Sequence, residues 1–236
     1  MHHLVVERWS RGTSSLHTRD ARAKLGVVLV FLVAVYTAPE RAQIQFAGFF
    51  LLLALAAWGA GLPLAGLLAR AALILPFSGV FALMTWWAGD PHRALALAEK
   101  SFLSGLASLL LVATTPLPIL LAALDSLRVP RLLILVIQFL YRYLFVMFDQ
   151  ARNMRLASLC RRGAGAAGKS GFRAAAGALG VLFARSWERA DGVYRAMLAR
   201  GFRGRFAALA PAPFGLADLW LLCAGAAACA AVRFTA

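Results

Sequence analysis

The sequence predicts an all-α, polytopic membrane protein with about five to seven membrane helices and a cytoplasmic pair of amphipathic helices. The first observation is composition, because the 236 residues are 61% hydrophobic and 15% charged. With a mean hydropathy of +0.74, this does not suit a soluble domain with a charged shell. The second observation is a series of apolar runs. The third is a basic, alanine-rich region over residues 149–213 with helical periodicity.

Six apolar runs are expected to enter the membrane. The segment before the first run is polar and basic and lacks a small-residue cleavage site, so this run is not expected to be a signal peptide. Acidic residues concentrate in two expected turns, 38–41 and 88–100. The runs are Leu25–Ala38, Ala42–Gly59, Leu62–Trp87, Ser101–Thr115, Leu132–Phe148 and Leu216–Val232.

The basic residues predict the sidedness of the chain. Twelve of the 25 Lys and Arg residues lie between Arg152 and Arg205, and five more precede Leu25 from Arg8 onward. Basic segments beside membrane spans are retained in the cytoplasm, so both regions are expected there, and an acidic partner or acidic headgroups are favoured over nucleic acid. An even number of crossings must then separate them. Five runs lie between, so either Leu25–Ala38 or Leu132–Phe148 does not cross fully.

Proline predicts a break after the fourth run. Pro116 and Pro118 should end the helix that begins near Ser101, because proline lacks the backbone donor. A short interfacial helix over Ile119–Leu127 is expected to follow, and a kinked continuous span is the alternative. The predicted domains are therefore residues 1–148 (N-terminal segment and membrane helices), 149–213 (cytoplasmic helices) and 214–236 (C-terminal membrane helix).

The stretch GAGAAGKSG, residues 163–171, has the letter pattern of a phosphate-binding P-loop. A working P-loop follows a buried β-strand, but the preceding residues NMRLASLCRR form a basic helical pattern. No later apolar strand ends in an acid that could hold Mg²⁺. Nucleotide binding through Gly168, Lys169 and Ser170 is kept as an alternative only.

A repeat at an offset of 38 residues surrounds this stretch. QARNMRLASLCRRG (Gln150–Gly163) aligns with ERADGVYRAMLARG (Glu188–Gly201), and both are basic amphipathic patterns that end in Arg-Gly. Glycine suits a helix C-cap, where it adopts positive φ freely. Small residues would let two such helices cross closely, and the terminal arginines suit bidentate pairing with carboxylates. The small residues are Ala151, Ala157, Ala190 and Ala199.

These residues resemble a known family. ERADGVYRAMLARGFRGRF resembles the second Ala-Arg-Gly coupling motif of the transmembrane T component of energy-coupling factor (ECF) transporters. SSLHTRDARAKL, LVATTPLPILLAALDSLRVPRLL and YRYLFVMFDQARNM resemble its N-terminal and central regions. The chain is most similar to the cobalt/nickel branch, whose permease is often called the Q component (EcfT/CbiQ-type). The first motif reads Cys160-Arg161-Arg162-Gly163, so Arg161 replaces the usual alanine.

The resemblance implies a non-catalytic coupling subunit of an ECF-type importer in the cell inner membrane, with cobalt as first substrate and nickel as second. Its partners would be two ABC-type ATPase subunits and an integral-membrane substrate-binding S component. ATP and magnesium would be bound in the ATPases, with no cofactor, metal or catalytic residue in this chain. The residues expected to couple to the ATPases are Arg155, Arg162, Gly163, Glu188, Arg195, Ala199, Arg200 and Gly201.

Isolated polar residues are expected to be structural. His2, His3, His17 and His92 lack convergent ligands. Cys160, Cys223 and Cys229 fit no zinc or redox spacing. Arg142 must face protein or extend to headgroups, and Asp20 with Arg22 could cap the first helix or act as a positive-inside signal.

The alternatives to a cobalt T component are a T component for a vitamin, an integral-membrane NTPase, a membrane enzyme and a secondary transporter. The enzyme is disfavoured because the apolar runs lack paired acids or clustered histidines.

Overall fold

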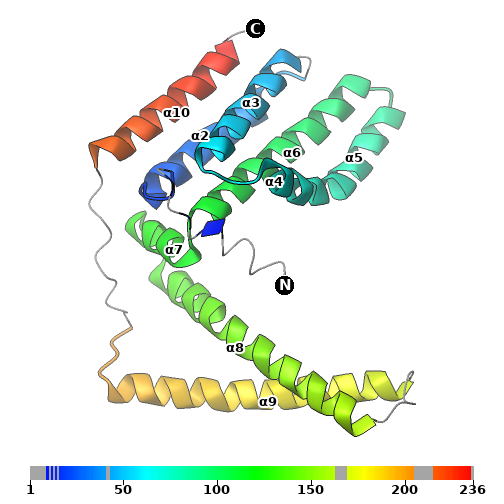
Figure 1. The fold of residues 1–236 in the computed structure, drawn as a ribbon, viewed down its shortest axis with the longest axis vertical. Helices are drawn as coiled ribbons and strands as arrows, with labels where there is room; N and C mark the ends of the chain where they lie inside the picture. Colours follow the sequence, from blue (N-terminus) through cyan, green and yellow to red (C-terminus); the bar gives the residue numbers. More distant parts are fainter. Residues whose placement is uncertain are drawn as a thin grey trace. The chain divides into compact units, whose positions relative to one another are not determined.

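The computed structural model describes residues 9–10, 12, 14, 16–40, 43–162, 169–204 and 215–234. Every regular element in these residues is a helix (Figure 1), which confirms the all-α class. The chain forms two compact units: unit 1 is Met1–Ala123 with Ala210–Ala236, and unit 2 is Leu124–Leu209. Residue 148, after which one predicted domain boundary was placed, lies inside the continuous helix α8 (Arg131–Arg162), and the predicted division into domains stays a prediction.

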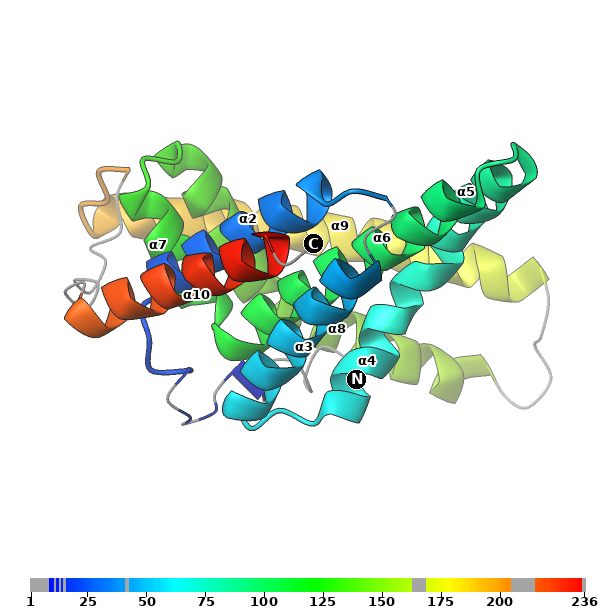
Figure 2. The same ribbon diagram turned by 90° about the horizontal axis from the view of Figure 1, so that it is seen from above.

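Unit 1 is a bundle of apolar helices. α2 packs against α10 and α6, α3 packs against α6 and α10, and α5 packs against α6. Figures 1 and 2 show α2, α3, α6 and α10 side by side. The helices are α2 (Ala21–Thr37), α3 (Gln43–Gly59), α4 (Leu64–Ala71), α5 (Leu75–Trp87), α6 (Pro91–Thr114) and α10 (Leu216–Phe234), with the 3₁₀ turn η1 (Ala72–Ile74) between α4 and α5.

Four helical segments in the described residues are long and apolar enough to cross a membrane: Leu64–Trp87, Pro91–Thr114, Arg131–Cys160 and Leu216–Phe234. α2 and α3 have 17 residues each, which corresponds to about 25 Å of helix. The polytopic architecture is thus confirmed.

Two expectations about helix boundaries are corrected. The predicted turn over residues 88–100 is a turn only at Ala88–Asp90, because α6 already begins at Pro91. Proline is favoured in the first helical turn, and the Ala, Leu, Glu and Lys residues that follow are strong helix formers. The run Leu62–Trp87 is interrupted by η1 just before Pro76. Pro76 has no N–H to continue an α-helical bond there.

The break after α6 is confirmed. α6 ends at Thr114, Thr115 is extended, and α7 (Leu117–Ser126) is a separate short helix. The chain therefore does not continue through Pro116 as one kinked span.

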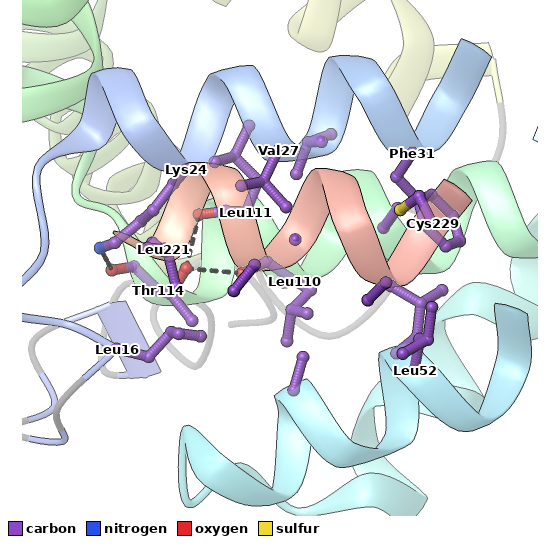
Figure 3. Close-up of a pocket in the computed structure, with 17 residues that line it drawn as sticks. Leu16, Lys24, Val27, Phe31, Leu52, Leu110, Leu111, Thr114, Leu221 and Cys229 are labelled. Carbon is purple, nitrogen blue, oxygen red and sulfur yellow. Dashed lines mark hydrogen bonds between the residues drawn. The ribbon is translucent and has the colours of Figure 1, made fainter. Parts of the chain in front are cut away.

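One end of unit 1, here called the Lys24 end, is held by a buried polar cluster. Lys24 Nζ donates to the carbonyl oxygens of His17 and Thr114 and contacts Thr115 Oγ1, at 3.2, 3.0 and 3.2 Å. Figure 3 shows Lys24 reaching from α2 to Thr114 at the end of α6. The Asp20 side chain caps α2 by accepting a hydrogen bond from the Arg22 N–H, which confirms the predicted capping role. Asp218 in α10 accepts the Asp20 N–H at 3.0 Å.

The opposite end of unit 1, here called the Lys100 end, carries the complementary contacts. Lys100 Nζ donates to the carbonyls of Tyr36 and Ala38 at the end of α2, at 3.0 and 2.8 Å. Arg233 at the end of α10 donates to the Thr37 carbonyl and to Gln45 Oε1. Cations at the C-terminal end of α2 and carboxylates at its start both favour the helix dipole.

These contacts fix which helix ends share a side of unit 1. The start of α2, the end of α6 and the start of α10 meet at the Lys24 end. The end of α2, the start of α3 and the end of α10 meet at the Lys100 end. The end of α6, the last long helix before unit 2, and the start of α10, the first helix after it, therefore lie on the same side of unit 1.

Unit 2 contains two long helices, α8 (Arg131–Arg162) and α9 (Lys169–Ala199). The predicted amphipathic segments are the C-terminal parts of these helices and are not separate elements. The apolar stretch over residues 174–184 is part of the first half of α9. Neither helix contains a proline that would break it.

The Lys24 contacts predict a specific loss of stability. Replacing Lys24 by Met leaves the buried Thr114 carbonyl without its cationic donor, so unfolding should become about 1–3 kcal/mol easier. Thermal unfolding in detergent is followed by a thiol-reactive dye in a background where the exposed Cys160 and Cys223 are replaced by Ser, so that the dye detects exposure of buried Cys229, and K24M should show a lower midpoint. The control is R152M, which removes a cation from an exposed position of α8. Equal midpoints for K24M and the unchanged protein would show that the cluster does not stabilise unit 1.

Candidate functional site

The second Arg-Gly motif ends α9 in a defined cap. Gly201 has φ of 77°. Its N–H donates to the Leu198 carbonyl at 3.0 Å, and the Phe202 N–H donates to the Met197 carbonyl at 3.0 Å. This pair of bonds is the Schellman motif, which requires a left-handed residue at the position of Gly201. The predicted glycine cap is confirmed here, and it terminates the helix directly beyond Arg200.

The first Arg-Gly motif is described only in part. Arg162 is the last residue of α8, but its side chain and Gly163 lie outside the described residues. The helix end is therefore at the predicted place, and a cap at Gly163 stays a prediction.

The other predicted coupling residues all lie on the surface of unit 2. Arg195 pairs with Asp191 one helical turn earlier at 2.6 Å, between side chains that are largely in solvent. Such exposed pairs contribute little stability, so this one leaves both groups available for a partner. The exposed residues are Arg155, Glu188, Arg195, Ala199, Arg200 and Gly201.

The two motifs are not brought together. Figures 1 and 2 show α8 and α9 running in opposite directions, with their C-terminal ends at opposite ends of unit 2. Arg162 and Arg200 therefore cannot form one binding site. The two helix ends therefore lie apart, and the end of α9 is exposed at Arg200.

The contact between α8 and α9 differs from the one expected. A cavity of about 350 Å³ lies between them, lined by Phe139, Tyr143 and Met147 of α8 and by Ala190, Val193 and Met197 of α9, among others. Ala190 lines this cavity, but it is exposed, as are the other predicted small residues Ala151, Ala157 and Ala199. The helices meet through the aromatic middle of α8, because its bulky side chains bury more apolar area than alanine could.

The context of the P-loop pattern is helical. α8 precedes it, α9 begins at Lys169, and the described part of the chain contains no β-strand. Residues 163–168 and the side chains of 169–171 lie outside the described residues. A P-loop normally follows a β-strand, but here the helix α8 stands in the place of that strand.

Unit 1 holds an apolar cavity of about 220 Å³ between α2, α3, α6 and α10 (Figure 3). Its walls include Val27, Phe31 and Leu110, and its charged lining residue is Lys24. The Lys24 amine is already bonded to three oxygens. These walls offer no free donors for a phosphate and no group of metal ligands.

The histidines and cysteines of the described residues do not converge, since no three His, Cys, Asp or Glu side chains there are close enough to hold a metal ion. His17 binds Ser14 Oγ through Nδ1 and the Trp9 carbonyl through Nε2, at 2.6 and 2.9 Å, which is the expected structural role. His92 is exposed, and His2 and His3 lie outside the described residues.

Two polar residues of unit 1 were not anticipated as a pair. Lys24 and Asp218 are 6% and 8% exposed but lie 194 positions apart in the sequence. The only local signal was a charge in the first turn of each apolar helix, and in α2 Lys24 shares that turn with Arg22.

The apolar helices of unit 1 identify the chain as an integral-membrane protein. A family model described as CbiQ, cobalt transport protein, matches residues 12–208. Because this match covers most of the chain, the chain belongs to the CbiQ cobalt transport protein family.

Two relatives match about half of the chain. An uncharacterized protein of Methanocaldococcus jannaschii is 30% identical over 104 residues, which cover 44% of this chain and 38% of the relative. A protein of Methanocorpusculum labreanum, described as a fused cobalt transport protein CbiMQ, is 31% identical over 110 residues, which cover 46% of this chain and 18% of the relative. The chain thus spans less than two fifths of the length of these relatives.

The Schellman cap predicts a local effect at Gly201. Alanine at φ of 77° is strained by about 1–2 kcal/mol, so the last turn of α9 should open more often in G201A. Hydrogen exchange of the Phe202 amide should accelerate about tenfold. G192A is the control, because Gly192 is helical and a Cβ there meets nothing within 4 Å. Unchanged exchange in G201A would contradict the cap.

Proposed function

We propose that this chain is the transmembrane T component of an ECF-type importer for a transition-metal ion, with cobalt the first choice and nickel the second. The observation that carries the proposal is the pair of helices in unit 2 that end at Arg162 and Arg200, within a chain of the cobalt transport family. Their opposite placement suits two separate partner subunits. A T component for a vitamin importer is the alternative, because the substrate would be recognised by another chain.

The sidedness follows from charge. The N-terminal segment and unit 2 are both basic, and such segments stay in the cytoplasm. The contacts at the Lys24 end support this assignment, because the start of α2, the end of α6 and the start of α10 share that side. The protein would lie in the cell inner membrane, with the Lys24 end and the coupling helices at the cytoplasmic face and the Lys100 end outside.

The coupling mechanism uses the arginines as charged contact points. Each helix end would dock in a groove of one ABC-type ATPase subunit, where the guanidinium would pair with carboxylates. The Schellman cap helps because it ends α9 abruptly and leaves Arg200 exposed at the tip. Closure of the ATPase dimer would move the two ends relative to each other.

The chain would do no chemistry itself. ATP and magnesium would be bound by the ATPases, and a separate integral-membrane S component would capture the metal. Motion of α8 and α9 would be transmitted to this S component through the membrane helices of the chain. No nucleic-acid partner is proposed.

The main rival is an integral-membrane NTPase that uses Lys169 and Ser170. The helix before this segment argues against it, since a P-loop follows a strand. Photolabelling of the purified chain by an ATP analogue, lost in K169A, would favour the rival.

Two substitutions test the docking role. Replacing Arg162 and Arg200 by glutamate should break charge-assisted contacts worth about 2–5 kcal/mol each. Each single variant should retain fewer ATPase subunits in affinity purification from solubilised membranes, and R162E/R200E should retain none and lose metal uptake.

The control is R173E, which makes the same charge change at the exposed N-terminal part of α9 and should keep the ATPases. All variants should reach the membrane in equal amounts. Full ATPase retention by the double variant would contradict the docking model. Metal uptake without any ATPase would favour a secondary transporter.

A further inference from the structure

The cavity in unit 1 reaches the outer surface of the helix bundle. α2 and α6 form its back, and α3 and α10 form its edges. α3 and α10 meet at the Lys100 end, where the Gln45 side chain donates to the Arg233 carbonyl at 3.0 Å. From there the two helices diverge (Figure 2). Ala224, in the α10 edge, is exposed, so the cavity opens in the gap between these two helices.

Water does not suit this cavity, because the polar groups in its walls are already bonded. The three N–H groups of Lys24 are matched by three oxygen acceptors. Thr114 Oγ1 donates to the Leu110 carbonyl at 2.9 Å. The other lining side chains are apolar apart from Cys229, whose thiol behaves as a small hydrophobe. A buried water needs about two to four polar partners, so the space suits an apolar occupant.

The shape of the cavity fits an extended hydrocarbon chain. Its walls run from Lys24 to Phe31 in α2 and from Leu221 to Cys229 in α10, which corresponds to about 12 Å along a helix. The hydrocarbon of one leaflet is about 15 Å deep, so the cavity spans most of a leaflet. A further membrane helix could not lie there along its length, because α3 and α10 already meet at the Lys100 end. Left empty, the walls would lose the dispersion contacts that a filled space provides.

Small residues on three helices make room for this space. One of them, Gly225, also packs closely on α2, since a Cβ there would lie 2.8 Å from a Val27 methyl group. The alanines are therefore the positions where a larger side chain would project into the cavity and fill it. The small lining residues are Ala56 in α3, Ala107 in α6, and Ala224, Gly225 and Ala228 in α10.

Two tryptophans lie on the helices that form the opening. Trp220 is near the start of α10, at the Lys24 end, and Trp58 is near the end of α3. Both side chains are largely exposed, and tryptophan is enriched at the level of the lipid headgroups. Trp220 thus marks the headgroup level at the Lys24 end, where Leu16 and Lys24 line the cavity. A hydrocarbon chain in the cavity would therefore come from the leaflet on that side.

We propose that the cavity of unit 1 binds one acyl chain of a bilayer phospholipid, taken from the leaflet at the Lys24 end. The opening is continuous with the apolar outer faces of α3 and α10, where Leu55 and Leu219 are about half exposed and contact acyl chains in any bilayer. The chain enters between α3 and α10, and the headgroup remains outside, beside Trp220. This inference does not depend on the proposed function or on unit 2.

Photocrosslinking in vesicles tests the proposal. The full chain is reconstituted in phosphatidylcholine that includes a phosphatidylcholine with a diazirine in the middle of one acyl chain, and the crosslinked residues are mapped by mass spectrometry. Leu110 and Cys229 line the cavity and are buried, so lipid outside the bundle should not label them. The unchanged chain should be labelled at both. Ala228→Leu, which fills the cavity, should lower this labelling several-fold, whereas the control A227L, at an exposed position of the same helix, should not.

A second variant, Ala56→Leu, repeats the comparison from α3 if A228L does not fold, and A47L at an exposed position of α3 is its control. Absence of label at the two buried residues in the unchanged chain would overturn the proposal, because the cavity would then be left to another occupant such as a side chain of a partner protein. Equal labelling of these residues in a filling variant and its control would overturn the proposal as well.

Discussion

Two lysines fasten the antiparallel helices α2 and α6 together, because each lysine lies in one helix and binds the C-terminal end of the other. Lys24, in the first turn of α2, donates to the carbonyl of Thr114, the last residue of α6, and Lys100, in α6, donates to the carbonyls of Tyr36 and Ala38 at the C-terminal end of α2. The terminal carbonyls of a helix have no partner within it and carry its negative dipole end, so an ammonium group satisfies both needs. α10 joins the same arrangement through Asp218 at one end and Arg233 at the other. The polar groups are thus confined to the two ends of an apolar bundle.

This confinement has a consequence for the rest of the chain. The same buried contacts that stabilise unit 1 also determine which helix ends share a side of the membrane. Because α6 ends and α10 begins at the Lys24 end, everything between them starts and finishes there. Unit 2 begins and ends its path from that one end of the bundle, and the proposed coupling residues at the ends of α8 and α9 belong to this segment.

Local signals in the sequence predicted the features that depend on neighbouring residues. Asp20 caps α2, Pro116 and Pro118 separate α7 from α6, and Gly201 ends α9, each through backbone chemistry within a few residues. The start of α6 at Pro91 was missed because a cluster of charges was interpreted as a turn. Contacts between distant segments could not be predicted, since nothing local indicates that Lys24 meets Thr114 or that Asp218 meets Asp20. The α8–α9 contact through Tyr143 and Met197 was missed for the same reason.

Cysteine accessibility tests most directly whether both coupling ends lie on the side of the N-terminus. Cys160 is exposed two residues before the end of α8, and Arg203→Cys marks the end of α9, while Glu40→Cys marks the Lys100 end. With the other cysteines replaced, a membrane-impermeant maleimide should label positions 160 and 203 only in inside-out vesicles and position 40 only from outside intact cells. Labelling of position 160 or 203 from the same side as position 40 would contradict the account.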